Sequence, residues 1–82
     1  MNEESIDIGD RLSARLFEQV IEIRKEKGMT QRELAQLSGV NLSVITKMEN
    51  GTSYPRLFTF LKILEGLDAT LQMGTLEDKM ME

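Results

Sequence analysis

The sequence predicts a mainly α-helical fold of four helices, followed by one short C-terminal β-strand. Three observations support this prediction. Apolar residues recur at helical spacing over residues 10–27, 30–51 and 57–67. Gly39 divides the middle stretch into two short helices, because glycine commonly ends a helix. From residue 69 onward the apolar residues occupy every second position, which is the spacing of a strand.

The first helix is predicted over about residues 10–27. Gly28 ends it, and Arg24, Lys25 and Lys27 near its end complement the negative end of the helix dipole. The apolar residues at helical spacing are Leu12, Leu16, Phe17, Val20, Ile21 and Ile23. Residues 1–9 are acidic and carry no apolar period, so we expect them to be a mobile N-terminus.

The second helix begins at a predicted capping box. The Thr30 hydroxyl can accept a hydrogen bond from the Glu33 amide, while the Glu33 carboxylate accepts one from the Thr30 amide. Leu34 and Leu37 are expected to point inward. Gly39 then ends the helix at a position where a positive φ is favourable for glycine.

The third helix begins after Asn41, which is a favourable N-cap residue. Ile45 and Met48 lie three residues apart and are expected to be buried, and the helix ends at Gly51. Its outer face is expected to carry Leu42, Ser43, Thr46 and Lys47.

Two short helices joined by a glycine turn form a helix-turn-helix unit, whose second helix enters the major groove of DNA. This stretch resembles the phage-repressor and Cro-like (XRE-type) family at Gln31, Ala35, Gly39, Val40, Ile45 and the terminal sequence MENG. The resemblance implies a lambda-repressor-like four-helix DNA-binding domain over residues 10–68. A helical hairpin that serves only as core is the alternative.

Composition excludes several other classes of function. The 82 residues include neither cysteine nor histidine, so we expect no enzyme, no metal site and no cofactor. No apolar run reaches the roughly 18 residues that a membrane span needs, and we expect a cytoplasmic protein. The net charge of -4 counts against nucleic-acid binding, but residues 11–64 hold nine basic and five acidic side chains. The helical body is therefore mildly basic.

The fourth helix follows a loop at TSYPR, where Pro55 disfavours helix at the preceding residue. Gly66 marks its end. The residues expected on its buried face are Leu57, Phe60, Leu61, Leu64 and Leu67. Phe58 falls off this face, and two interpretations remain open: packing under a loop beside Tyr54, or contact with a second copy of the chain.

The predicted strand covers residues 69–76, with Ala69, Leu71, Met73 and Thr75 on one face. A lone strand cannot satisfy its backbone hydrogen bonds, and the rest of the chain is predicted to be helical. We therefore expect a homodimer in which two such strands pair antiparallel about a two-fold axis. A frayed tail packed on its own helices is the alternative. Residues 77–82 are expected to be disordered.

The order of an N-terminal helix, a helix-turn-helix, a helix reading TFLKILEGL and a strand resembles the antitoxin partners of HipA-type kinase toxins. The resemblance covers nearly the whole chain. It implies a dimer that represses its own operon and holds a HipA-like kinase toxin inactive. The alternatives are a stand-alone regulator without a toxin, and a protein-interaction module that does not bind DNA, which the acidic net charge suggests.

Family resemblance also implies which residues meet a double-stranded DNA operator, which should be a palindrome if the protein is a two-fold dimer. The base-reading positions are Asn41, Leu42, Ser43, Thr46 and Lys47. The phosphate or minor-groove positions are Thr30, Gln31, Thr52, Ser53 and Arg56. Leu42 replaces the glutamine common among relatives, so it can make only apolar contact with a base.

One structural contact is also implied by the resemblance. Family members pair an arginine at the place of Arg24 with the glutamate that ends the recognition helix, which is Glu49 in this chain. We therefore expect an Arg24–Glu49 ion pair that fixes the first helix against the third. An arginine that extends into water is the alternative.

Overall fold

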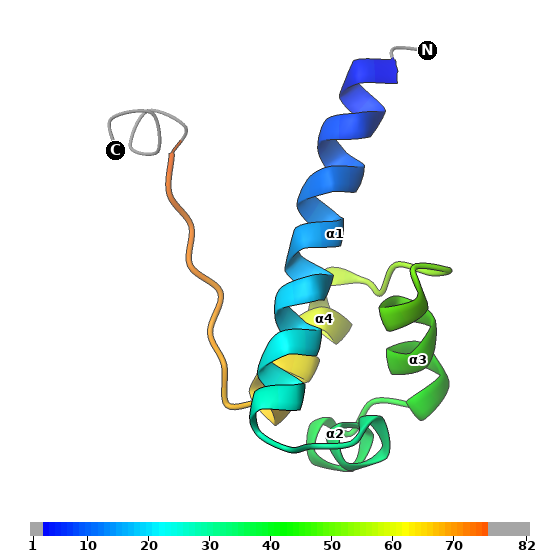
Figure 1. Cartoon of the computed structure of the whole chain (residues 1–82), viewed down its shortest axis with the longest axis vertical. Helices are drawn as coiled ribbons and strands as arrows, with labels where there is room; N and C mark the ends of the chain where they lie inside the picture. The colour runs from blue at the N-terminus through cyan, green and yellow to red at the C-terminus, as the bar shows by residue number, and fades with distance from the viewer. Residues whose placement is uncertain (1–2, 76–82) are drawn as a thin grey trace.

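A computed structural model describes the backbone of residues 3–75, with side chains from residue 11 onward. The four predicted helices are all present: α1 (Glu3–Glu26), α2 (Gln31–Ser38), α3 (Leu42–Asn50) and α4 (Leu57–Gly66). Helices α2, α3 and α4 gather around the C-terminal half of α1, whose N-terminal half projects beyond them (Figure 1). The helix-turn-helix formed by α2 and α3 therefore lies at one end of the molecule.

Helix α1 begins at Glu3, well before its predicted start near residue 10. Residues 3–9, which were expected to precede the first helix, are therefore helical, while residues 1–2 lie outside the described part. An apolar period reveals only the part of a helix that packs on a core.

The core lies between the C-terminal half of α1 and the other three helices. Among the described residues its buried apolar members are Val20, Leu34, Val40, Ile45, Met48, Phe60, Ile63, Leu64 and Leu67. Leu16, Phe17, Ile23 and Met29 pack against its edge. Burial of this apolar surface, at about 25 cal/mol per Å², is the main stabilising contribution to the fold.

Four leucines that were expected to be buried are exposed. Leu12 is 61% exposed because it lies on the projecting half of α1, and Leu57 is 68% exposed at the first residue of α4. Leu37 is 64% exposed, because α2 turns Leu34 and Ser38 toward the core instead. In α4 the buried face is displaced from the predicted one, so Ile63 is buried and Leu61 is exposed.

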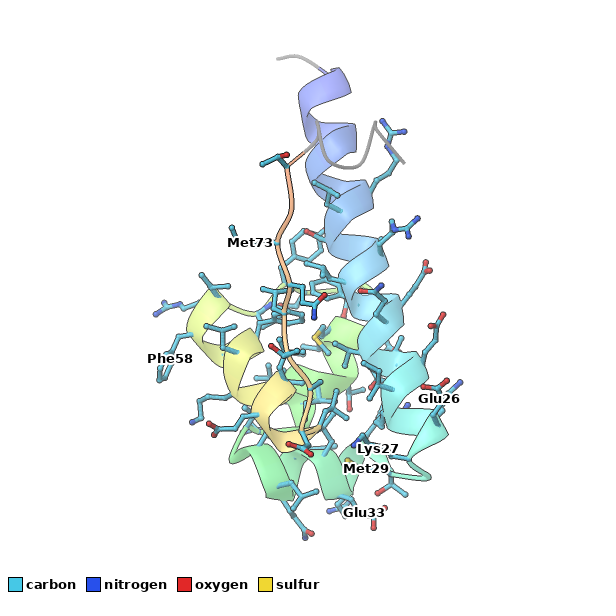
Figure 2. All side chains as sticks on the ribbon, turned by 90° about the vertical axis from the view of Figure 1, so that its left-hand side faces the viewer. Glu26, Lys27, Met29, Glu33, Phe58 and Met73 are labelled. Carbon is cyan, nitrogen blue, oxygen red and sulfur yellow. The ribbon has the colours of Figure 1, made fainter. Side chains whose placement is uncertain are left out.

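Phe58 lies outside the core and is 74% exposed, pointing outward from α4 (Figure 2). Its ring lies 6.0 Å from the Lys62 ammonium. Tyr54 packs instead edge-on against Phe17, with ring centroids 5.6 Å apart. The interpretation in which Phe58 packs beside Tyr54 is therefore wrong.

Helices α2 and α4 lie in close contact at Gly66 and Ser38. A Cβ atom added at Gly66 would lie 2.8 Å from the Ser38 Cβ and 2.9 Å from the Ser38 backbone nitrogen. Ser38 is itself buried, and its hydroxyl accepts a hydrogen bond from the Val40 amide over 3.3 Å. Gly66 is thus required by close packing of the two helices.

Residues 69–75, which we call the arm, leave α4 through Asp68, whose φ is 55°. The arm runs as an extended chain beside α1 rather than as a paired strand (Figure 1). Its beginning is fixed by a 2.9 Å hydrogen bond from the Ala69 amide to the Leu64 carbonyl. Because the described chain is otherwise helical, it supplies no partner strand for the arm; residues 76 and 77–82 lie outside the described part.

Candidate nucleic-acid interface

The N-terminus of α2 is closed by the predicted capping box. The Glu33 amide donates to the Thr30 hydroxyl over 3.0 Å, and the Thr30 amide donates to the Glu33 carboxylate over 2.8 Å. The hydrogen bond that the Thr30 amide donates to the carboxylate is the main cause of the lowered pKa of Glu33, and the Thr30 side chain also lowers this pKa. The carboxylate therefore stays ionised at the exposed start of the helix.

The turn between α2 and α3 sets the angle of the second helix. Gly39 adopts a φ of 71° and its amide bonds the Ala35 carbonyl, which ends α2. Val40 is buried beneath the turn. The Asn41 carboxamide oxygen accepts hydrogen bonds from the Ser43 amide at 3.0 Å and the Ser43 hydroxyl at 3.1 Å. Asn41 is therefore engaged as the cap of α3.

Helix α3 has a buried and an exposed face. Ile45 and Met48 are buried, whereas Ser43, Lys47 and Asn50 are exposed at a spacing of four and then three residues. Leu42 and Thr46 are half-buried at the margin between the two faces. The predicted base-reading residues thus divide into Asn41, Ser43 and Lys47, which are exposed, and this half-buried pair.

The structure brings Arg24 and Glu49 together in a two-point contact. The Arg24 Nε lies 2.8 Å from Glu49 Oε2, and Arg24 Nη2 lies 2.7 Å from Glu49 Oε1. Their side chains are only 11% and 5% exposed. Arg24 Nη1 also donates to the Met29 carbonyl over 2.9 Å, so the guanidinium joins α1, the turn before α2, and α3.

Gln31 belongs to the same cluster. Its Nε2 donates to Glu49 Oε1 over 2.8 Å, and its Oε1 accepts from the Thr46 hydroxyl over 3.2 Å. The sequence did not predict either bond, because Gln31 is 18 residues from Glu49 and 15 from Thr46, and no local spacing pattern connects them. The first residue of α2 is thus bonded to the middle and the end of α3.

The charges in this cluster stabilise each other. The hydrogen bond to Glu49 raises the pKa of Arg24. Burial alone would raise the pKa of Glu49, but the hydrogen bonds from Arg24 and Gln31, with the charges of Arg24 and Lys25, outweigh it and lower that pKa. Both groups therefore remain ionised at neutral pH.

The loop after α3 carries the remaining predicted DNA contacts. The Thr52 hydroxyl and amide both donate to the Lys47 carbonyl, over 3.2 and 2.9 Å, which closes the end of α3. Ser53 is exposed. Arg56 is also exposed and precedes α4 without donating a side-chain cap. The Arg56 guanidinium is thus available to an external group.

Two other kinds of site are absent from the described residues. No cluster of three or more carboxylate, histidine or cysteine side chains could hold a metal ion there. None of the described helices has the length and apolar character needed to cross a membrane. The exposed face of α3 and its flanks are therefore the candidate site.

Comparisons with known proteins place this geometry among DNA-binding domains. A helix-turn-helix family model, HTH_3, matches residues 20–73. An uncharacterized HTH-type transcriptional regulator of Haemophilus influenzae is 37% identical over 78 residues, which cover 95% of this chain and 79% of that protein.

Two further similarities concern one antitoxin. Antitoxin HipB of Escherichia coli K12 is 35% identical over 51 residues, which cover 62% of this chain but only 58% of HipB. A chain in the solved structure titled HipA-HipB-O2-O3 complex is 30% identical with a TM-score of 0.70, and the match covers 77% of this chain and 89% of that one. The helical domain is thus shared with proteins solved in such assemblies.

Proposed function

Because the chain belongs to the HTH_3 helix-turn-helix family of XRE- and Cro-like DNA-binding transcription regulators, we propose that it acts as a homodimeric repressor on a palindromic operator. Its lambda-repressor-like arrangement of four helices presents α3 as the recognition helix. The observation that supports the proposal most strongly is the division of α3 into a buried face and an exposed polar face.

In this proposal α3 reads bases from the major groove. Lys47 donates to guanine and Ser43 adapts to either donor or acceptor, while Leu42 makes apolar contact with a thymine methyl. Asn41 contributes its amide NH₂ group, because its oxygen is engaged in the cap of α3. A two-point contact with adenine would require that cap to open.

Phosphate contacts would flank the recognition helix on both sides. The N-terminus of α2, at Thr30 and Gln31, offers the Gln31 amide and the positive end of the helix dipole to the DNA backbone, while the Thr30 amide is used in the capping box. On the other side Thr52 and Ser53 approach a phosphate and Arg56 approaches the minor groove. These contacts set the position of α3 in the groove but carry no base preference themselves.

Dimerisation would come from pairing of two arms, as strands, about a two-fold axis. Along the arm Ala69 packs on the core, Leu71 is 38% exposed and Met73 is 92% exposed, so one face of the arm is progressively uncovered. An open groove of about 520 Å³ lies between the arm and α1, lined in part by Leu16, Ile23 and Leu71. A partner arm would supply the missing backbone bonds and apolar side chains for the groove.

Exposed apolar residues on α4 support the same assembly. Leu57, Phe58 and Leu61 are 68%, 74% and 43% exposed. An apolar surface of this kind on a small domain commonly marks an association site. We propose that Phe58 contacts the second copy.

A titration of DNA at several salt concentrations tests the repressor proposal. Palindromic duplexes are first selected from a random library with the purified chain. We expect two chains per duplex, weak binding of a single half-site, and an affinity that falls steeply between about 50 and 200 mM salt as counterions are released. No binding at low salt would leave the protein-interaction module as the remaining function.

We further propose that the dimer neutralises a HipA-like kinase toxin, which its similarity to HipB supports. The test is to mix the chain with a HipA-type kinase encoded beside its own gene, and to measure co-elution and kinase activity. A stable complex with reduced kinase activity is expected. DNA binding without any complex would make the chain a stand-alone regulator.

A further inference from the structure

Thr46 is the one residue of the predicted base-reading set whose side-chain donor is bonded to another helix. We propose that Thr46 and Glu49 are positioning residues that hold the Gln31 amide toward the DNA backbone, and that Thr46 does not read bases. This inference rests on the proposed function, because it assigns roles within the same DNA-binding surface.

The two bonds to Gln31 specify the orientation of its amide. A glutamine amide has two donor hydrogens on nitrogen and an acceptor oxygen. Glu49 can only accept, so it requires the nitrogen on its side, at 2.8 Å. The oxygen then faces Thr46, whose hydroxyl donates to it over 3.2 Å. A flipped amide would place its oxygen against the Glu49 carboxylate, which is repulsive.

Glu49 is itself held in place. Arg24 donates hydrogen bonds to both carboxylate oxygens of Glu49 and to the Met29 carbonyl just before α2. The carboxylate that orients Gln31 is therefore fixed to α1 and to the turn that precedes α2. Thr46 closes the cluster from the middle of α3.

This arrangement decides which groups remain for DNA. Gln31 keeps one Nε2 hydrogen at the N-terminus of α2, beside the backbone amides that offer a phosphate site. The Thr46 hydroxyl hydrogen is used within the protein, and its side chain is half-buried. Base preference would then come from Asn41, Leu42, Ser43 and Lys47, while Thr46 affects every sequence alike.

The experiment compares Thr46→Val, Thr46→Ser and Ser43→Ala on the selected operator and on a panel of operators with single base-pair changes. Valine keeps the shape of threonine and removes only the hydroxyl, whereas serine keeps the hydroxyl. We expect Thr46→Val to raise Kd about three- to tenfold on all operators alike, with their ranking and salt dependence unchanged. Thr46→Ser should bind within about twofold of the wild type, and Ser43→Ala should change the ranking.

A second measurement separates positioning from a purely structural role. If Thr46 acts through Gln31, then Thr46→Val should add no further loss of binding in a Gln31→Ala background. Thermal unfolding of each variant verifies that it is folded.

Two results would overturn the inference. The first is a Thr46→Val variant whose operator preference changes at one base pair. The second is a loss of DNA binding on Thr46→Val that is equally large in the wild-type and Gln31→Ala backgrounds. If the wild type binds no DNA at low salt, the proposed function fails and this inference fails with it. If the wild type binds and only these comparisons fail, the repressor proposal stands.

Discussion

Arg24 and Glu49 lie 25 residues apart in the chain and meet through two hydrogen bonds of 2.8 and 2.7 Å. The contact joins the end of α1 to the end of α3, with both side chains nearly buried. Met29 and Gln31 are bonded directly to this pair, and Thr46 is bonded to it through Gln31. The recognition helix is therefore held by a polar cluster as well as by the core beneath Ile45 and Met48.

Removal of one partner of this ion pair should strongly destabilise the fold. Glu49→Ala leaves the Arg24 guanidinium buried without its carboxylate, and we expect a loss of about 3 kcal/mol in the free energy of unfolding. For a domain of this size that is a fall of roughly 12–24 °C in Tm. Thermal unfolding followed by circular dichroism measures it, with exposed Glu18→Ala as the matched control. An unchanged Tm for Glu49→Ala would remove the ion pair from the stability of the fold.

The lowered pKa of Glu49 predicts how the stability of the fold depends on pH. The pKa of Glu49 is lower in the folded chain than its ordinary value of 4.5, so the unfolded chain binds more protons between the two values. The stabilisation is fully present above pH 4.5 and is lost as the pH falls through the folded pKa. Tm measured from pH 7 down to pH 3 should therefore fall below about pH 4.5.

A Glu49→Gln variant should show a smaller acid-dependent fall in Tm. Arg24 and Lys25 from α1 and Gln31 from α2 are the groups that interact with this carboxylate. The pKa of Glu33 is also lowered, so a Glu33→Gln variant is needed to measure how much of the acid-dependent fall in Tm comes from Glu33. If Glu49→Gln kept the entire acid dependence of the wild type, the effect would belong to other carboxylates.

The crossing of α2 and α4 predicts a cost for one added methyl group. Gly66→Ala would place its Cβ 2.8 Å from the Ser38 Cβ, so the helices must separate, and we expect a loss of about 1–3 kcal/mol. Gly74→Ala is the control, because nothing lies within 4 Å of a Cβ at that position. Urea unfolding of both variants measures the difference. Equal stability of the two would mean that α2 and α4 separate without cost.

Two basic residues should differ in how they affect DNA binding. Lys47→Ala should cost about 1–3 kcal/mol on the preferred operator and much less on sequences without the base it contacts. Arg56→Ala should weaken binding to all sequences more uniformly and reduce the salt slope by about one. Fluorescence anisotropy on matched and altered operators measures both. Equal, sequence-independent losses would remove Lys47 from base readout.

Dimerisation through the arm can be tested at its most exposed apolar side chain. Met73→Asp should raise the dimer dissociation constant by at least about tenfold, because it puts a charge into the arm pairing. The folded monomer should be unaffected, since Met73 is 92% exposed and lies on the arm in Figure 2. Gly74→Asp, at the next position and therefore on the opposite face of an extended arm, is the control, because nothing lies within 4 Å of a Cβ at that position. Sedimentation equilibrium that shows an unchanged dimer for Met73→Asp would place the interface elsewhere.

Local signals in the sequence predicted the helix-turn-helix well. The Thr30 capping box, the Gly39 turn and the Asn41 cap each depend on residues within a few positions of one another, and all three are present. The Gln31 contacts with Thr46 and Glu49 could not be predicted in this way. They depend on the angle between α2 and α3, which no short stretch of sequence specifies.

Helix α4 shows why apolar spacing predicts a helix better than its buried face. Its sequence is apolar nearly all around, so two adjacent faces fit the helical period almost equally well. Packing against Ser38 through Gly66 selects the face that carries Ile63, and Leu57 and Leu61 are left outside. The sequence also could not show that the arm is unpaired within one chain. The alternating spacing of a strand does not indicate which segment pairs with it.

Only Leu67 and Asp68 separate Gly66, where α4 touches α2, from the first residue of the arm. Hydrogen bonds of the Leu67, Asp68 and Ala69 amides back to α4 leave this connection little freedom. If two arms pair, the separation of the two recognition helices is then set by packed helices and not by a flexible linker. One extra base pair between half-sites moves them apart by about 3.4 Å along the duplex and also rotates them. Such a protein would accept a single spacer length in its operators and reject sites with correct half-sites at another spacing.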